Sequence, residues 1–187
     1  KKINLKSKKN YFLKGYWQGI NFFCQNLNKI IKEINLNIIN KKINKSFFKN
    51  KNNLMIHIRR GDYLDKKNLL KHGVLDKFYY IKAINYIQNL LNKKLNIIIF
   101  TDDINWARKK FIFLEKKIFY DKNFNNPKDV LSHMKYCDHF ILSNSTFSWW
   151  AAYLGHNKNK IVVIPKNWYL DKRFSSSNLK LKNWRVL

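Results

Sequence analysis

The sequence predicts an α/β fold with a Rossmann-like, mostly parallel sheet and helices on both faces. Two observations lead to this prediction. From residue 53 onward, short apolar runs of strand length alternate with longer segments whose apolar residues recur at helical spacing. This alternation requires crossover connections, which place helices on both faces of a parallel sheet. The five expected strands lie at residues 54–59, 95–100, 117–120, 139–142 and 161–164.

Four helices are expected between these strands. Asp76 is a typical N-cap for a helix at residues 77–91. The apolar residues that should face the core from this helix are Phe78, Ile81, Ile84, Ile87 and Leu91. The other helices follow residues 101–103, start at Pro127 and end before Gly155.

Composition indicates a globular chain. Of its 187 residues, 45% are hydrophobic and 16% aromatic, which is enough for a real core. No run of 18 apolar residues suggests a membrane span. Cys24 and Cys137 are too few for a disulfide framework, and the five histidines show no metal-ligand spacing. We therefore expect no metal site, and a reducing, cytoplasmic compartment.

The net charge of +27, from 38 Lys and Arg against 11 Asp and Glu, draws attention to polyanions as partners. The cations are nearly all Lys, however, and they are interspersed with Asn and Ile along the whole chain. This pattern favours a solvated surface, so we expect no nucleic-acid partner. Two alternatives stay open: a non-catalytic polyanion-binding protein, and peripheral association with an anionic membrane.

Two arginines stand side by side where the first strand ends. Arg59 and Arg60 precede Gly61 in a chain that contains only five arginines. Ligands of parallel sheets bind at the carboxyl ends of the strands, and a guanidinium group fits a phosphate with two parallel hydrogen bonds. One of the pair is therefore expected to bind a diphosphate and to stabilise it as a leaving group without a metal. The alternative is a structural ion pair of Arg59 with Asp62 or Asp102.

The neighbours of this pair allow structural and functional interpretations. His57 lies on an apolar strand, where a histidine is more often packed than bound to a ligand. Asp62 is expected to orient an arginine or to cap the turn. Asp102 and Asp103 follow the second strand and precede a helix that they could cap. The alternative for Asp102 is that it supports the arginine pair from behind.

The fourth strand ends in four small hydrogen-bonding residues, Ser143, Asn144, Ser145 and Thr146. The free backbone N–H groups at the start of the following helix form a natural anion site. Capping explains one of these residues but not all, so we expect this turn to hold a diphosphate opposite the arginines. Asp129, on the preceding helix, could accept two hydrogen bonds from a guanine edge, although a solvated helix residue is the default.

Four stretches of the chain together resemble glycosyltransferase family 11, the alpha-1,2-fucosyltransferases. Residues 57–63 look like that family's HxRRGDY motif, and residues 100–106 like its (F/Y)(S/T)DDxxW segment. Residues 143–152 look like its SNSxFSWWAA block, and residues 15–18 like its GYWQ stretch. Their order and spacing fit, and the likeness covers residues 11–168.

The resemblance implies a GT-B-like enzyme that transfers L-fucose from GDP-fucose to a galactoside hydroxyl, with inversion and without a metal or other cofactor. Its partners would be a nucleotide sugar and a glycan acceptor, in surface glycan or lipopolysaccharide synthesis. In the wider superfamily the arginines of HxRR hold the diphosphate, which makes Arg59 and Arg60 the catalytic residues here. The implied donor-binding residues are His57, Arg59, Arg60, Asp62, Asp102, Asp129, Asn144, Ser145, Thr146 and Ser148.

The family pattern also divides the chain. Members normally begin with a strand and a GGLGNQ-type loop, followed by an acceptor-side domain, and this pattern is not found in the sequence. Residues 1–50 are therefore expected to be a remnant of that domain with a connecting helix. Residues 51–187 are expected to form the GDP-sugar-binding Rossmann-like domain, the C-terminal half of a GT-B-like enzyme. A related transferase that uses another nucleotide sugar is the alternative.

Overall fold

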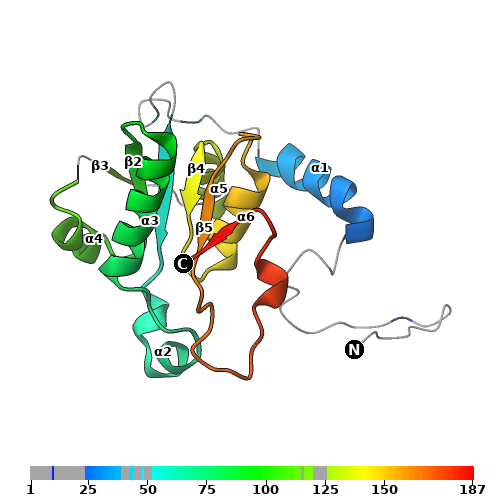
Figure 1. The fold of residues 1–187 in the computed structure, drawn as a ribbon. Helices are drawn as coiled ribbons and strands as arrows, with labels where there is room; N and C mark the ends of the chain where they lie inside the picture. The colour runs from blue at the N-terminus through cyan, green and yellow to red at the C-terminus, as the bar shows by residue number, and fades with distance from the viewer. Residues whose placement is uncertain are drawn as a thin grey trace.

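The structure is a computed structural model that describes residues 10, 24–38, 43, 48, 52–114, 116–119 and 126–187. In this part of the chain, six parallel strands form one sheet in the order β3-β2-β1-β4-β5-β6 (Figure 1). They are β1 (Asn53–Ile58), β2 (Asn96–Thr101), β3 (Lys116–Phe119), β4 (His139–Ile141), β5 (Val162–Ile164) and β6 (Arg185–Val186). The predicted Rossmann-like α/β fold is confirmed.

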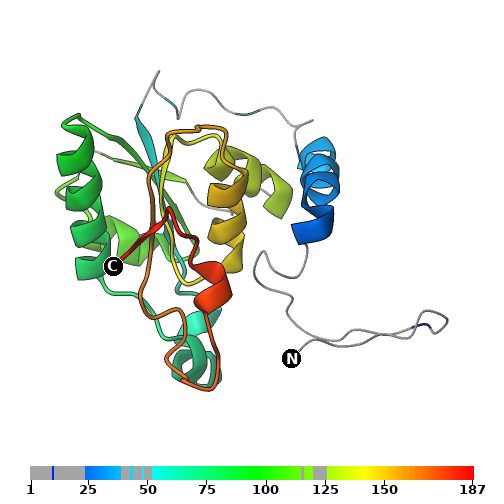
Figure 2. The ribbon, with the colours of Figure 1, turned by 45° about the vertical axis from the view of Figure 1, so that its right-hand side comes forward.

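Helices cover both faces of this sheet, as Figure 1 and Figure 2 show. Helices α3 and α4 pack on one face, α5 and α6 pack on the other, and α1 lies beside α5. The α-helices are α1 (Leu27–Ile38), α2 (Lys66–His72), α3 (Lys77–Leu91), α4 (Ile104–Lys110), α5 (Pro127–Lys135) and α6 (Thr146–Leu154). Single turns of 3-10 helix occur at Cys24–Asn26, Asp62–Leu64 and Ser177–Leu179.

Strand β1 separates two hydrophobic cores. Leu54, Ile56 and Ile58 pack into the core under α3 and α4, whereas Met55 packs into the core under α5 and α6. All four side chains are fully buried. Successive residues of a strand point to opposite faces, so a strand buried on both faces reads as a continuous apolar run. This is why the sequence predicted β1 so clearly.

Helix α3 begins and ends where the sequence predicted. The Asp76 carboxylate accepts a hydrogen bond of 3.0 Å from the backbone amide of Tyr79. The residues that α3 buries are Tyr80, Ala83, Ile84 and Ile87. The prediction that Phe78 faces the core was wrong, because its side chain is 67% exposed. At about 100° per residue, Phe78 lies on the side of the helix opposite the buried stripe.

One α-helix and one strand of the described chain were not predicted. Helix α2 exposes Leu69 and Leu70 and buries no residue, so its sequence lacks the apolar periodicity from which a helix is predicted. Strand β6 has only two residues, too few to form a recognisable pattern. The GYWQ-like stretch at residues 15–18 lies outside the described residues, as does Tyr120 at the end of the third predicted strand. Most of residues 1–50 lie outside them too, so the domain boundary near residue 50 stays a prediction.

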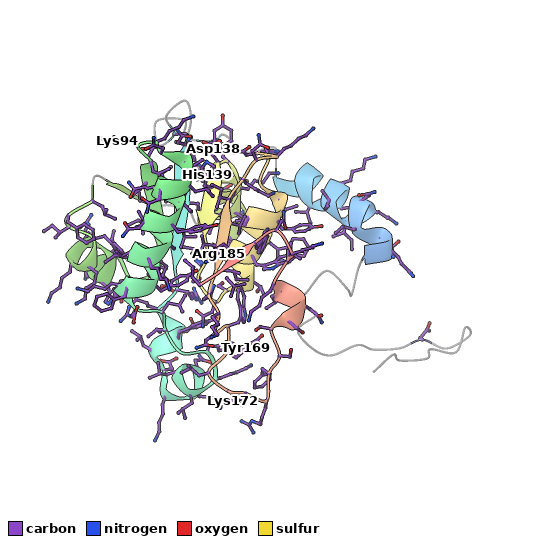
Figure 3. All side chains as sticks on the ribbon, in the orientation of Figure 1. Lys94, Asp138, His139, Tyr169, Lys172 and Arg185 are labelled. Carbon is purple, nitrogen blue, oxygen red and sulfur yellow. The ribbon has the colours of Figure 1, made fainter. Side chains whose placement is uncertain are left out.

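The sheet has one point where its strand order reverses. From β1 the chain moves outward to β2 and β3, and then returns to place β4 on the other side of β1. Ligands of open α/β sheets bind outside the carboxyl ends of the strands at such a point. This is the edge at which α2 follows β1, at the bottom of Figure 1. Tyr169 and Lys172 lie near it in Figure 3, and Lys94, Asp138 and His139 lie at the opposite edge.

Candidate functional site

A hydrogen bond joins the carboxyl ends of β1 and β4. Nδ1 of His57 lies 2.6 Å from Oγ of Ser143, and both side chains are buried. Burial, with a smaller effect of the Arg59 charge, lowers the pKa of His57 from 6.5 to about 3. The imidazole is therefore neutral near pH 7. The pair holds together the two loops that carry the rest of the site.

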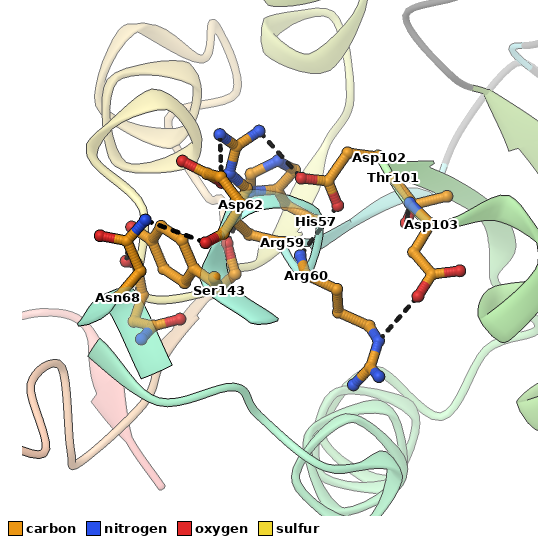
Figure 4. Close-up of polar contacts among 11 residues, drawn as sticks. His57, Arg59, Arg60, Asp62, Asn68, Thr101, Asp102, Asp103 and Ser143 are labelled. Carbon is orange, nitrogen blue, oxygen red and sulfur yellow. Dashed lines mark hydrogen bonds and ion pairs between the residues drawn. The ribbon is translucent and has the colours of Figure 1, made fainter. Parts of the chain in front are cut away.

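Arg59 lies directly after β1 and bridges two carboxylates (Figure 4). Its Nη2 is 2.7 Å from Oδ1 of Asp62, and its Nη1 is 2.9 Å from Oδ2 of Asp102. The side chain is still 35% exposed. The structural ion pair weighed from the sequence is thus present with both candidate carboxylates. These two carboxylates offset the charge of Arg59, and much of its hydrogen-bonding capacity is already used.

Arg60 is held differently from its neighbour. Its Nε lies 3.0 Å from Oδ2 of Asp103, and its guanidinium carbon lies 4.4 Å from the centre of the Trp106 ring. The two terminal amino groups of Arg60 have no protein partner among the described residues. The side chain is 15% exposed and is therefore held in one orientation. Of the two arginines, Arg60 offers the free hydrogen-bond donors.

The end of β2 supports both arginines. Oδ1 of Asp102 accepts a hydrogen bond of 2.8 Å from the backbone amide of Arg60, while Oδ2 pairs with Arg59. A Cβ atom at Gly61 would lie 2.8 Å from Oδ2 of Asp102, so only glycine fits this close approach. Asp103 caps α4 by accepting the Trp106 amide at 3.0 Å. Asp102 thus supports the arginine pair, and Asp103 caps the helix, so each of the two roles considered from the sequence is filled by one residue.

The loop after β4 leads into α6 without a side-chain cap. Ser145 occupies the N-cap position, and its side chain makes no capping hydrogen bond. The first amides of α6 are therefore available, within the described chain, to bind an anion. Thr146 is partly exposed beside them. Ser148 is fully buried and donates its hydroxyl hydrogen bond to the Ser145 carbonyl, so its side chain does not face this opening.

Asn144 connects this loop to two others. Its side chain is 1% exposed, and Nδ2 donates hydrogen bonds to the carbonyls of His72 at 2.8 Å, Trp168 at 3.3 Å and Gly73 at 3.4 Å. The Tyr63 hydroxyl donates a hydrogen bond of 3.2 Å to the backbone carbonyl of Asn144. Asn144 was predicted to bind a ligand, and in the structure its side chain instead links the loop after β4 to the segments at His72–Gly73 and Trp168.

Asp129 lies in the first turn of α5, which packs beside α6. Both helices lead back from the carboxyl edge of the parallel sheet toward its other edge, so their first turns lie at the same edge as the arginines. The Asp129 side chain is partly buried. The structure brings all ten predicted site residues to this edge. Among them, Arg60 keeps free hydrogen-bond donors, and Thr146 is partly exposed beside the uncapped amides of α6.

The chain matches the model of a known protein family. The model of glycosyl transferase family 11 matches residues 1–187. The chain belongs to glycosyltransferase family 11. The resemblance predicted from the motifs is therefore confirmed.

Curated proteins similar to this family 11 chain come from bacteria and animals. The O-antigen biosynthesis glycosyltransferase WbnK of Escherichia coli is 33% identical over 192 residues, covering 96% of this chain and 62% of that protein. The alpha-1,2-colitosyltransferase of Escherichia coli is 32% identical over 197 residues, covering 98% and 65%. The galactoside 2-alpha-L-fucosyltransferase Sec1 of Mus musculus is 28% identical over 102 residues, covering 53% and 27%. The chain thus spans just under two thirds of the length of the two Escherichia coli relatives.

Three residues of this family 11 site were absent from the predicted set. Asp103 holds Nε of Arg60, Trp106 lies against the same guanidinium group, and the Tyr63 ring centre lies 5.6 Å from the guanidinium carbon of Arg59. Burial raises the pKa of Tyr63 to about 12, so its hydroxyl keeps its proton. A rule that pairs each arginine with a nearby carboxylate and aromatic ring could have found them.

The described residues show neither a metal cluster nor a membrane-spanning helix. They contain no group of three or more His, Cys, Asp or Glu side chains that could hold a metal ion. Among the helices of this part of the chain, none has the length and apolar character needed to cross a bilayer.

Proposed function

We propose that this chain is the donor-binding half of an enzyme that transfers L-fucose from GDP-fucose to a galactoside hydroxyl. The observation that carries the proposal is the arrangement of Arg60 and the amino end of α6. The free amino groups of Arg60 and the uncapped amides of α6 follow adjacent strands at the point where the strand order reverses. Guanidinium groups and helix amino ends are two common binding elements for a diphosphate. Membership of family 11 supports the same conclusion.

In this proposal the two loops act on the leaving group. As the bond between C1 of fucose and the diphosphate breaks, negative charge grows on the phosphate oxygens. The amino groups of Arg60 and the amides of α6 would stabilise that charge without a metal or another cofactor. Arg59, paired with Asp102, would fix the loop that carries Arg60. The acceptor hydroxyl would attack C1 from the opposite side, which inverts the configuration. We assign no general base.

The remaining predicted residues take supporting roles in this proposal. Ser145 and Thr146 would contact phosphate through hydroxyl groups, and Asp129 would read the guanine edge. Asp62 and Asp102 would hold Arg59. The residues that would position the loops are His57, Asn144 and Ser148. The partners are a nucleotide sugar and a glycan acceptor in cytoplasmic synthesis of surface glycan or lipopolysaccharide.

The test is calorimetric titration of GDP-fucose into the full-length protein and into Arg59→Ala and Arg60→Ala variants. A charge-assisted hydrogen bond contributes about 1.5–3 kcal/mol, so Arg60→Ala should weaken binding about 10–100-fold. Arg59→Ala should weaken it as well. Arg108→Ala is the control, because Arg108 is exposed in the last turn of α4. Unchanged affinity and turnover in both variants would contradict the proposal.

A second donor sugar is favoured by one observation. The relative named as an alpha-1,2-colitosyltransferase is 32% identical over a region that covers 98% of this chain. Turnover of GDP-fucose and of nucleotide-activated colitose by the full-length protein would distinguish the two sugars. Asp129→Ala tests the nucleotide, because loss of the preference for GDP over ADP is expected only if Asp129 reads guanine.

A non-catalytic polyanion-binding protein is the remaining alternative, and it is motivated by the net charge of +27. Polyanion binding falls steeply with salt concentration, because it depends on counterion release. A specific diphosphate site should instead keep its preference for guanine nucleotides at moderate salt. Competition between GDP and a polyanion at two salt concentrations would separate the two functions.

A further inference from the structure

The turn between α4 and β3 exposes two large apolar side chains next to each other. Ile112 is 80% exposed and Phe113 is 62% exposed. No other large hydrophobic residue in the described chain is more exposed than Ile112. Single exposed apolar residues are normal on protein surfaces, but adjacent ones at a protruding turn need an explanation.

Three cations precede this apolar tip. Arg108, Lys109 and Lys110 form the last turn of α4. Arg108 and Lys109 are exposed, and Lys110 is partly buried. Within the part of the chain that the structure describes, none of the three forms an ion pair with a carboxylate. Their charge is therefore available to an external anion.

The apolar tip, Ile112 and Phe113, directly follows a buried aromatic residue. Phe111 is fully buried, and its ring centre lies 6.4 Å from that of Phe113 and 5.9 Å from that of Trp106. Phe113 therefore has a partner on its inner side and solvent on its outer side. The packing fixes the direction in which the tip points, so docking would need no refolding of the turn.

The apolar tip also lies apart from the candidate site. It leads into β3, an edge strand of the sheet, and both β3 and α4 lie on the left of Figure 1. Helix α4 separates it from Asp103, the partner of Arg60, by seven residues or about 10 Å. An object that touches the tip would therefore leave the carboxyl edge near β1 and β4 accessible.

We propose that residues 108–113 dock this protein on an anionic lipid bilayer. Ile112 and Phe113 enter the headgroup region, and Arg108, Lys109 and Lys110 contact lipid phosphates. Stable attachment to a bilayer needs two signals, and here an apolar tip is combined with a cluster of three cations. The excess of 38 basic over 11 acidic residues attracts the whole chain to the same surface. This proposal does not depend on the donor sugar.

The test is sedimentation of the full-length protein with vesicles of phosphatidylcholine, alone and with one third phosphatidylglycerol. The wild type should sediment only with the anionic vesicles. The double variant Ile112→Ser/Phe113→Ser should bind about tenfold more weakly. Phe78→Ser is the matched control, because Phe78 is 67% exposed on α3, and it should change binding less than about twofold.

A second set of variants tests the charge. Changing Arg108, Lys109 and Lys110 to Gln should weaken vesicle binding at least about tenfold. The control changes three exposed lysines on separate elements to Gln, with the same loss of charge: Lys82, Lys128 and Lys158. This control should lose less than about threefold. Equal losses in the two sets would mean that charge alone attracts the protein, and would overturn the assignment of residues 108–113.

Two further results bear on the apolar tip itself. Ile112→Trp should strengthen vesicle binding, because Trp favours the membrane interface. Activity on a soluble acceptor should be unchanged in the Ser variants, which also checks that they fold. Vesicle binding that does not respond to any change at Ile112 or Phe113 would overturn the proposal. So would a double Ser variant that loses self-association or RNA binding while it keeps vesicle binding.

Discussion

The carboxylate of Asp103 lies 3.0 Å from Nε of Arg60 and at the same time caps α4. Oδ2 faces the guanidinium group, and Oδ1 accepts the backbone amide of Trp106. One side chain thus starts the helix and orients the arginine to which we assign the diphosphate. Because each task uses a different oxygen atom, substitutions can separate them.

Asp103→Asn should weaken donor binding about tenfold while leaving stability nearly unchanged. Asn is as good an N-cap as Asp, but it removes the charge that holds Arg60. Asp103→Ala should lose the cap as well and destabilise the fold by about 1 kcal/mol. Calorimetric titration and thermal unfolding measure the two effects. If Asp103→Asn binds donor like the wild type, Asp103 does not position Arg60.

Gly61→Ala should destabilise the turn after β1 by about 1–3 kcal/mol, since the new Cβ would lie 2.8 Å from Oδ2 of Asp102. The carboxylate would have to leave its contacts with Arg59 and with the Arg60 amide. Donor affinity should fall together with stability. The cause can be checked in an Asp102→Ala background, where the same Gly61→Ala change should cost less than about 0.5 kcal/mol. An undiminished cost there would show that another contact is responsible.

Stability should fall as the pH is lowered from about 6.5 to about 3, partly because of His57. Its pKa is 6.5 in the unfolded chain and about 3 in the fold, so the unfolded state binds more protons in this window. The resulting slope reaches about 1.4 kcal/mol per pH unit, and His57 adds none above pH 7. Burial also lowers the pKa values of other histidines, namely His72, His139 and His156.

Urea unfolding of a His57→Gln variant isolates the contribution of His57, because the other histidines are common to both proteins. The difference in stability between wild type and variant should shrink as the pH falls through this window. Ser143→Ala is the control, since it removes the hydrogen bond but keeps the ionisable ring, and it should retain the slope. Parallel pH curves for wild type and His57→Gln would contradict the low pKa.

Trp106→Leu should weaken donor binding about threefold to tenfold, because the Arg60 guanidinium carbon lies 4.4 Å from the ring centre. Trp106→Phe keeps an aromatic face and should lose less. Tyr86→Leu is a suitable control, since its ring contacts Arg185 of β6 at 5.1 Å in a similar way but away from the proposed donor contacts. Equal donor affinity in Trp106→Leu and wild type, measured by titration, would exclude a positioning role for the ring.

The parts of the fold that the sequence predicted well are those determined by local signals. The apolar run of β1 and the Asp76 cap of α3 each need only neighbouring residues to be recognised. Helix α2 was missed because it buries no residue and is held partly by a distant segment: the Lys71 carbonyl accepts the Leu170 amide at 3.0 Å. Such a contact depends on a segment that lies about a hundred positions further along the chain.

The candidate site shows the same limit. The arginine pair was recognisable because Arg is rare in this chain, but its partners depend on how β1 and β2 align. Their register places Ile58 opposite Thr101, which brings Asp102 and Asp103 beside the arginines. Asn144 was predicted to face a ligand, whereas its amide donates to carbonyls that only the folded chain brings near.

The hydrogen bond between His57 and Ser143 spans 86 positions of sequence. During synthesis the site can therefore be completed only after Ser143 has been added to the chain. A nascent chain that ends before β4 carries both arginines and their carboxylates, but it lacks the neighbouring strand and α6. Contacts between such distant residues form late, because the loop between them must first close against its entropy. We therefore expect ribosome-bound intermediates to display the guanidinium pair before the proposed diphosphate site can form, which makes chaperone protection most useful in that interval.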